Sequence, residues 1–220
     1  MSHHIARRSL VKEISEKGIK DPRVLEAIYN TPRHIFVDSI FKSRAYKDMS
    51  LPIGYKQTIS QPFIVAKMTE ILIQGNVLEQ RPLGNVLEVG TGCGYQAAVL
   101  SNFCKRLYSA ERIEALSLRA KKNLKSLDIK NVVVKFSDIK NGWPEKKYFD
   151  AIICTAAIPD ITNSLLEQLK INGKLIFPKG NNSSQNLVLI TKKRKGKIEE
   201  EILDKVLFVP MLDGEVEINQ

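Results

Sequence analysis

The sequence predicts an α/β protein in which a mostly parallel sheet of seven strands forms the middle of three layers. From residue 84 onward, short apolar and β-branched runs alternate with helix-like stretches, which is typical of a parallel sheet covered by helices. The last two apolar runs are separated by a charged turn without a helix, which favours an antiparallel hairpin at the sheet edge. Over about the first 45 residues the apolar spacing is helical, so a helical extension precedes the sheet.

Length and composition are those of a single globular domain. With 220 residues, 43% hydrophobic and 26% charged, the chain is long enough to bury a core and is not largely disordered. We expect one domain over residues 1–220, with the helical extension and a loop in residues 1–60 and the α/β core in residues 61–220.

Three short helices are expected in the extension. The first covers residues 5–14 and ends near Gly18, and the second starts at the Asp-Pro pair 21–22 and stops before Pro32. Apolar residues between positions 36 and 41 mark the third.

A loop containing Pro52 and Gly54 separates these helices from the next one. Apolar residues recur with helical spacing over residues 63–72. Ser60 is expected to cap the N-terminus of this helix, because its hydroxyl precedes Pro62 in the first helical turn.

The core then alternates strands and helices. Helices are expected at residues 95–103, 112–126 and 160–170, and the edge hairpin turns around Gly196. The predicted strands are residues 86–89, 107–110, 132–136, 151–154, 175–177, 186–191 and 202–209.

The net charge of +10 raises the question of nucleic-acid binding. The chain has 34 Lys and Arg residues against 24 Asp and Glu residues, and the excess lies in residues 1–50 and 101–150. Most of the basic residues are Lys, which favours a solvated basic surface over a groove that grips phosphate.

Localisation signals point to a cytoplasmic protein. No apolar run is long enough to cross a bilayer, and the polar residues 1–14 do not form a signal peptide. The chain has three Cys, without a C-x-x-C pair, and three His, without zinc-ligand spacing. We therefore expect reduced thiols, with Cys93 as a small buried thiol, and no metal site.

A glycine loop follows the first predicted strand. Gly90, Gly92 and Gly94 allow the backbone to turn sharply and to approach a ligand closely. The spacing is G-x-G-x-G, and Tyr95 occupies the place of the third glycine in dinucleotide-binding loops.

Two acidic residues narrow the type of ligand. Glu88, at the end of the first strand, disfavours a pyrophosphate, and Glu111, at the end of the next strand, can accept hydrogen bonds from ribose hydroxyls. Together they favour a positively charged nucleoside such as S-adenosylmethionine.

Two stretches resemble known motifs. Residues 88–94, Glu-Val-Gly-Thr-Gly-Cys-Gly, resemble motif I of class I S-adenosylmethionine-dependent methyltransferases. Residues 51–62, Leu-Pro-Ile-Gly-Tyr-Lys-Gln-Thr-Ile-Ser-Gln-Pro, resemble the signature of the protein-L-isoaspartate O-methyltransferase family. The similarity covers nearly the whole chain, with further matches at 33–37, 45–46, 64–70, 95–98, 111–112, 149–152, 155–157, 173–175 and 208–210.

The resemblance implies a Rossmann-like methyltransferase fold, with S-adenosyl-L-methionine as cofactor and S-adenosyl-L-homocysteine as product. The implied reaction methylates the free carboxylate of L-isoaspartyl residues in damaged proteins, and the ester then closes to a succinimide.

The resemblance also implies roles for individual residues. Ser60 and Thr58 are the expected catalytic residues, with Ser60 as a hydrogen-bond donor to the substrate carboxylate. Substrate binding is expected of Ile53, Gly54, Gln57, Ile59, Gln61, Val209 and Pro210. Cofactor binding is expected of Glu88, Gly90, Thr91, Gly92, Gly94, Gln96, Glu111, Arg112, Asp138, Ile139 and Thr155.

One loop departs from the family pattern. The family carries glycines on both sides of the Asp after the third strand, whereas this chain has Ser137 and Ile139 around Asp138. In the family this loop lies along the adenine, so Ile139 either packs on the adenine plane or narrows its slot.

The implied chemistry needs no general base. A carboxylate is already ionised at pH 7, which agrees with the absence of His near the motifs. Catalysis would come from alignment and exclusion of water, with loop 51–61 as the clamp and the N-terminus of the following helix favouring an anion.

Two alternative functions stay open at this point. One is a methyltransferase acting on RNA or a small molecule through the basic surface, and the other is a non-catalytic cofactor-binding homologue. For the main hypothesis we expect damaged proteins as partners, a monomer, and no binding to nucleic acid or membranes.

Overall fold

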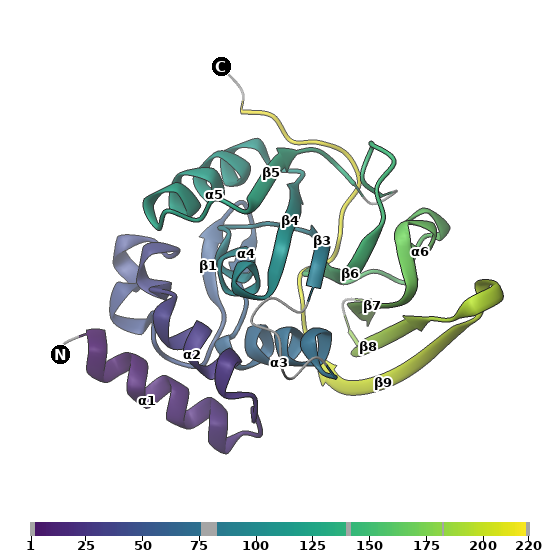
Figure 1. Ribbon diagram of the computed structural model, residues 1–220. Helices are drawn as coiled ribbons and strands as arrows, with labels where there is room; N and C mark the ends of the chain where they lie inside the picture. Colours follow the sequence, from purple (N-terminus) through teal and green to yellow (C-terminus); the bar gives the residue numbers. More distant parts are fainter. Residues whose placement is uncertain (1–2, 76–82, 140–141, 182, 219–220) are drawn as a thin grey trace.

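A seven-stranded sheet organises the protein, in the order β5-β4-β3-β6-β7-β8-β9 (Figure 1). The computed structural model describes residues 3–75, 83–139, 142–181 and 183–218. Strands β5, β4, β3, β6 and β7 pair in parallel, and β8 and β9 are antiparallel to their neighbours. The strands are β3 (Leu83–Val89), β4 (Cys104–Glu111), β5 (Val132–Phe136), β6 (Phe149–Cys154), β7 (Leu169–Gly180), β8 (Gln185–Lys192) and β9 (Ile198–Val206).

Helices cover both faces of this sheet, so the predicted three-layer α/β fold is confirmed. The larger core cluster joins β3 and β4 to α3 (Pro62–Ile73), α4 (Tyr95–Leu100) and α5 (Glu114–Ser126). The smaller cluster on the other face includes Leu165 of α6 (Asn163–Gln168) and Trp143. The 3₁₀ turns η3 (Ser101–Phe103) and η4 (Arg194–Gly196) lead into β4 and β9.

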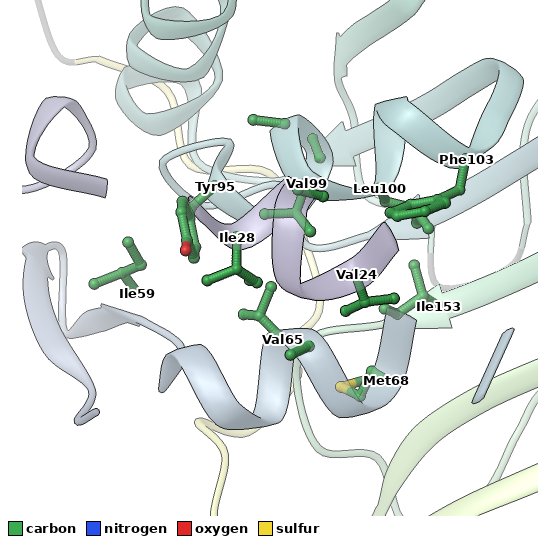
Figure 2. Close-up of a cluster of buried hydrophobic side chains, with 14 of the residues drawn as sticks. Val24, Ile28, Ile59, Val65, Met68, Tyr95, Val99, Leu100, Phe103 and Ile153 are labelled. Carbon is green, nitrogen blue, oxygen red and sulfur yellow. The ribbon is translucent and has the colours of Figure 1, made fainter. Parts of the chain in front are cut away.

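The N-terminal helices extend the larger core. Helix α1 (His3–Glu16) and helix α2 (Pro22–Asn30) lie outside α3 and α4 in Figure 1. Figure 2 shows Val24 and Ile28 of α2 among side chains of α3 and α4, with Ile153 of β6 nearby. Asp21 caps α2 by accepting a hydrogen bond from the Arg23 amide, as the Asp-Pro pair predicts.

The prediction of a third helix at residues 36–41 was wrong. Two 3₁₀ turns, η1 (Arg33–Ile35) and η2 (Ser39–Arg44), occupy this region instead. Phe36 and Val37 are buried, but Ile40 is 76% exposed, so these apolar residues do not form one continuous buried face.

The predicted loop around Pro52 and Gly54 is a small antiparallel hairpin. It consists of β1 (Leu51–Gly54) and β2 (Gln57–Ile59). Tyr55 and Lys56 form its tip with φ of 53° and 56°, a left-handed conformation that these residue types rarely adopt. The sequence lacks the Asn-Gly or Asp-Gly pair that usually marks such a turn.

The expected capping role of Ser60 was also wrong. Gln61 is the N-cap residue of α3, and its side chain makes no capping bond. The Asp48 carboxylate caps the helix from outside, because its Oδ1 accepts a 2.8 Å hydrogen bond from the Phe63 amide. None of the helices within the described residues combines the length and apolar character that a membrane span requires.

Candidate active site

The candidate site lies where the sheet order reverses direction. The chain proceeds from β3 to β4 and β5 on one side, and returns to β6 and its followers on the other side of β3. Parallel α/β sheets bind ligands at such a point, beside the carboxyl ends of the strands. The glycine loop follows β3 there, Glu111 ends β4, and Thr155 follows β6.

Gly90 is the position where the loop requires glycine most strictly. Its φ is +97°, and a Cβ atom there would lie 2.5 Å from Oγ1 of Thr155. The Thr155 hydroxyl donates to the Gly90 carbonyl, and the Gly90 amide donates to the Ala110 carbonyl at 2.9 Å. The loop is therefore fastened to both neighbouring strand ends, with no room for a side chain.

Glu111 joins the end of β4 to the same loop. Its Oε2 accepts a 2.8 Å hydrogen bond from the Gly92 amide, and its Oε1 accepts a 2.9 Å bond from the Ile113 amide. The side chain is buried; burial raises the pKa of the carboxyl, and the two amides oppose this shift. Each oxygen keeps a further lone pair for a ligand hydroxyl.

The main cavity opens at this junction and holds about 640 Å³ of space, its mouth included. Its walls come from five regions: the hairpin, the glycine loop with β4, the loop after β5, the loop after β6, and the segment after β9. The lining residues are Gln57, Thr58, Val89, Gly90, Gly92, Ala110, Glu111, Arg112, Ile113, Ser137, Asp138, Ile139, Thr155, Ala156, Val209, Pro210, Met211 and Leu212.

Arg112 and Asp138 line this cavity, and both hold the C-terminal segment, residues 207–218. Arg112 Nε donates to the Gly214 carbonyl at 2.7 Å, and Asp138 Oδ2 accepts a 2.7 Å bond from the Gly214 amide. Figure 1 shows the segment as a yellow coil that leaves β9 and runs past β6 towards β5. The Ala157 amide binds the Val209 carbonyl at 2.8 Å, which fixes Val209 and Pro210 at the cavity wall.

Ile139 forms an apolar part of the wall. It is 2% exposed and belongs to the core cluster that also holds Trp143. The Gly142 amide donates to the Ile139 carbonyl at 2.8 Å. Positions 140 and 141, in the loop that differs from the family pattern, lie outside the described residues.

Two further hollows adjoin the main cavity. The inner hollow lies over the glycine loop and α4, and the outer groove lies between α3 and the end of β9. Thr58 and Thr155 line all three spaces, and Ser60 lines both the inner hollow and the outer groove. Of the two residues expected to be catalytic, Thr58 therefore lies where the three spaces meet, and Ser60 lies between two of them.

The remaining expected residues lie around this junction. Thr91 and Gln96 line the inner hollow with Ile59, and Gln61 lines the outer groove. Gly94 is the N-cap residue of α4 with φ of +90°, and Ile53 and Gly54 belong to β1. Glu88 is fully buried and reaches none of the three spaces.

Arg33 and Asp48 support the site, although sequence reasoning assigned them no role. The buried Arg33 guanidinium donates to the carbonyls of Ala45 and Met49 at 2.8 Å each and to that of Ser60 at 3.1 Å. Asp48 Oδ2 accepts a 2.8 Å bond from Gln61 Nε2. The only sequence signal was that Arg33 falls in a stretch matching the family.

Among the described residues, no group of three or more His, Cys, Asp or Glu side chains is arranged to hold a metal ion.

Comparisons with known proteins agree with this geometry. A model of the protein-L-isoaspartate(D-aspartate) O-methyltransferase family matches residues 5–216. Protein-L-isoaspartate O-methyltransferase of Pseudomonas paraeruginosa is 44% identical over 216 residues, which cover 98% of this chain and 100% of that protein. The Methylobacillus flagellatus enzyme of the same name is 48% identical over 97% of this chain and 95% of its own.

Solved structures give the same result. A Plasmodium falciparum structure described as a β-aspartate methyltransferase, in complex with S-adenosyl-L-homocysteine, matches with a TM-score of 0.78 at 27% identity. It covers 93% of this chain and 97% of its own. Another protein-L-isoaspartate O-methyltransferase structure matches with a TM-score of 0.81 at 26% identity, over 94% of this chain and 66% of its own. The chain therefore belongs to the protein-L-isoaspartate(D-aspartate) O-methyltransferase family.

Proposed function

We propose that this chain transfers the methyl group of S-adenosyl-L-methionine to the free carboxylate of L-isoaspartyl residues in damaged proteins and peptides. The observation that carries the proposal is the junction at Thr58 and Thr155, where a nucleoside-sized cavity meets a separate open groove. Family membership favours a protein substrate over RNA or a small molecule.

The residues around the main cavity fit this cofactor. Gly90 leaves a cradle that a Cβ atom would fill, Glu111 can bind ribose hydroxyls, and Ile139 offers an apolar surface to the adenine. When bound, S-adenosyl-L-methionine supplies an electrophilic methyl group on a positively charged sulfur. Of the other proposed cofactor residues, Arg112 and Asp138 hold the C-terminal segment, and Thr155 bonds the glycine loop.

Ser60 is the proposed hydrogen-bond donor to the substrate carboxylate. It lines the inner hollow and the outer groove, so its hydroxyl can face a group that enters from the groove. Within the described ranges this hydroxyl makes no hydrogen bond, whereas the nearby Phe63 amide at the start of α3 is already bound to Asp48. Ser60 is therefore better placed than the helix amide to bind an anion.

The proposed chemistry requires orientation more than proton transfer. The substrate carboxylate is ionised at pH 7, so Ser60 and Thr58 need to bind and orient it. The hairpin carries Thr58, and Arg33 holds the Ser60 carbonyl and thereby the position of its side chain. Val209 and Pro210 also line the main cavity and reduce the room left for water there.

The test uses an isoaspartyl peptide and the same peptide with a normal aspartyl residue. Methyl-labelled S-adenosyl-L-methionine should label the isoaspartyl peptide alone. Equal labelling of both peptides, or labelling of neither, contradicts the proposal. A Ser60→Ala variant that binds S-adenosyl-L-homocysteine but turns over slowly separates loss of chemistry from loss of cofactor binding.

The proposal also includes the cellular compartment, the oligomeric state and the absence of nucleic-acid binding. We infer a cytoplasmic monomer over residues 1–220 that binds no nucleic acid. The three buried free cysteines support a reducing compartment, and residues from both the extension and the core share one hydrophobic cluster, which supports a single domain. Light scattering tests whether the protein is a monomer. Salt-dependent retention on heparin beyond that on a neutral resin would contradict the absence of nucleic-acid binding.

A further inference from the structure

Glu88 belongs to the glycine-loop motif but faces away from the three spaces of the site. Its side chain has no exposed surface. Strand pairing places it beside Ser109 of β4 and Ile153 of β6. Because side chains alternate along a strand, Glu88 lies on the same face as Val86, which belongs to the larger core under the helices.

The hydrogen bonds of Glu88 lead back to the loop through two hydroxyls. Ser109 Oγ donates to Glu88 Oε2, and Ser109 Oγ lies 2.6 Å from Thr91 Oγ1. The other carboxyl oxygen, Oε1, is buried and has no hydrogen-bond partner among the described residues. Thr91 is 4% exposed and lines the inner hollow, so the chain of contacts runs from a buried acid to the cofactor side of the loop.

Among the described residues, no cation forms an ion pair with Glu88. Of the buried or half-buried cations on the helical side, Arg33 and Lys174 bind backbone carbonyls, and Arg119 pairs with Asp38. The charged neighbour on β4 is Glu111, which repels a second negative charge. Cys93 and Tyr95, at the start of α4, have raised pKa values because of burial and stay neutral.

The physical consequence is a neutral carboxyl. Burial raises the pKa of Glu88 to about 8; the bond from Ser109 opposes the shift, and the charge of Glu111 adds to it. A buried, unpaired carboxylate is costly, so the group keeps its proton instead.

We propose that Glu88 is a positioning residue that acts as an uncharged hydrogen-bonding group: through Ser109 it fixes the Thr91 hydroxyl and thereby the glycine loop. Two backbone amides of the loop, those of Gly90 and Thr91, donate to the Ala110 carbonyl of β4 at 2.9 and 3.1 Å. The hydrogen bonds from Glu88 through Ser109 to Thr91 add a side-chain connection between the loop and the core. This inference rests on the proposed function only for the identity of the ligand.

The main test compares Glu88→Ala, Glu88→Gln and the wild type in calorimetric binding of S-adenosyl-L-homocysteine. Glu88→Ala should bind at least tenfold more weakly, because Ser109 loses its partner. The uncharged isostere Glu88→Gln should restore binding. Glu167→Gln, an exposed glutamate on α6, is the matched control and should change nothing.

The pH profile distinguishes an uncharged Glu88 from an ionised one. One pH unit above the Glu88 pKa the wild type should bind about tenfold more weakly than at neutral pH, whereas Glu88→Gln should lack this additional loss. The ligand titrates identically with both proteins, so any difference between their pH profiles of binding is caused by the ionisation of Glu88. If Glu88→Gln fails to restore binding while the wild type gains affinity at high pH, Glu88 acts as an anion and the proposal is wrong.

An infrared measurement on the ligand-free protein gives an independent answer. The wild type should show the band of a protonated carboxyl at neutral pH, and this band should decrease as the pH rises above 8. Glu88→Gln should lack it, and Ser109→Ala should keep it but bind the ligand more weakly. Absence of the band in the wild type overturns the proposal. Neither readout requires turnover, so failure of the isoaspartyl assay leaves this test intact.

Discussion

Gly90 and Thr155 fit together so closely that neither position tolerates much change. A Cβ atom at Gly90 would lie 2.5 Å from Thr155 Oγ1, and the backbone there has a φ of +97°. Both the steric contact and the left-handed conformation oppose a larger residue.

Gly90→Ala should therefore lose S-adenosyl-L-homocysteine binding and destabilise the fold by about 1–3 kcal/mol. Calorimetric binding and urea unfolding measure the two effects. Gly196→Ala is a suitable control, because Gly196 also has a positive φ, of +71°, but nothing lies within 4 Å of its added Cβ. Equal effects of the two variants on binding would show that the contact with Thr155 is unimportant.

Ser60 should affect turnover without affecting the fold. Since Gln61 and not Ser60 is the N-cap of α3, Ser60→Ala removes no capping bond. A lost hydrogen bond to a charged group costs about 1.5–3 kcal/mol, so kcat/KM for an isoaspartyl peptide should fall by roughly 10- to 150-fold. Unfolding midpoint and cofactor affinity should stay at wild-type values. A large loss of stability would indicate a structural role for the hydroxyl.

Glu88 should also give the protein a pH-dependent stability. The unfolded chain releases this proton near the ordinary carboxyl pKa of 4.5, and the folded chain keeps it up to about pH 8. Between these values the folded state binds more protons, so the free energy of unfolding falls as pH rises, by at most about 1.4 kcal/mol per unit. Urea unfolding across this range should show a slope that Glu88→Gln lacks. Parallel slopes in the two proteins would rule this out.

At the scale of elements, the hairpin and the start of α3 depend on two buried charged side chains. Arg33 donates hydrogen bonds to three backbone carbonyls. Asp48 accepts hydrogen bonds from the Gln61 side chain, the Phe63 amide and the Lys17 side chain. The Asp48 side chain is 0% exposed. These contacts give a short hairpin, which would be unstable alone, a fixed place beside the cofactor loop.

Asp48→Asn should weaken this support. An amide cannot accept all of these bonds, so we expect a loss of about 1–2 kcal/mol in unfolding free energy, together with lower turnover as Gln61 and Ser60 shift. Asp128→Asn is the control, since Asp128 pairs with Lys130 at a fully exposed position (81% and 80%). Similar urea midpoints for both variants would show that Asp48 does not hold the helix.

The same region shows why sequence patterns predicted some elements and missed others. Alternating strands and helices were predictable because each strand holds a short, mostly buried run, at residues 86–89 of β3 and 107–110 of β4. The hairpin was not, because its strands have four and three residues and its tip uses Tyr55 and Lys56 in left-handed conformations. The cap on α3 comes from Asp48, which lies fifteen residues before the capped Phe63 amide, so no local motif marks it.

At the scale of the whole molecule, cofactor binding should raise stability. A ligand that binds only the folded state at 100 times its Kd adds about 2.7 kcal/mol. For a chain of 220 residues this corresponds to an increase in Tm of roughly 5–10 °C. Thermal unfolding with S-adenosyl-L-homocysteine measures it, and adenosine diphosphate serves as a control ligand. An equal shift with both would argue against the proposed cofactor.

The site as a whole was less predictable than the sheet, for a physical reason. Glu111 and Gly90 follow strand ends, so the parallel topology places them together. Arg112 and Asp138 also line the cavity, but their bonds to residues 213 and 214 depend on a segment about a hundred and about seventy-five residues later in the chain. Likewise, only packing shows that Glu88 lies in the core and not at the ligand.

The position of residues 209–212 in the cavity wall also bears on how the protein is made. The ribosome synthesises the glycine loop long before it reaches these residues. A nascent chain that has exposed the whole of β3, β4 and β6 still lacks one side of its cofactor pocket. The cofactor therefore meets only part of its pocket during translation, so the early stages of folding rest mainly on the hydrophobic contacts of the sheet. Chains released prematurely before residue 209 would fold, at best, into forms that lack this wall.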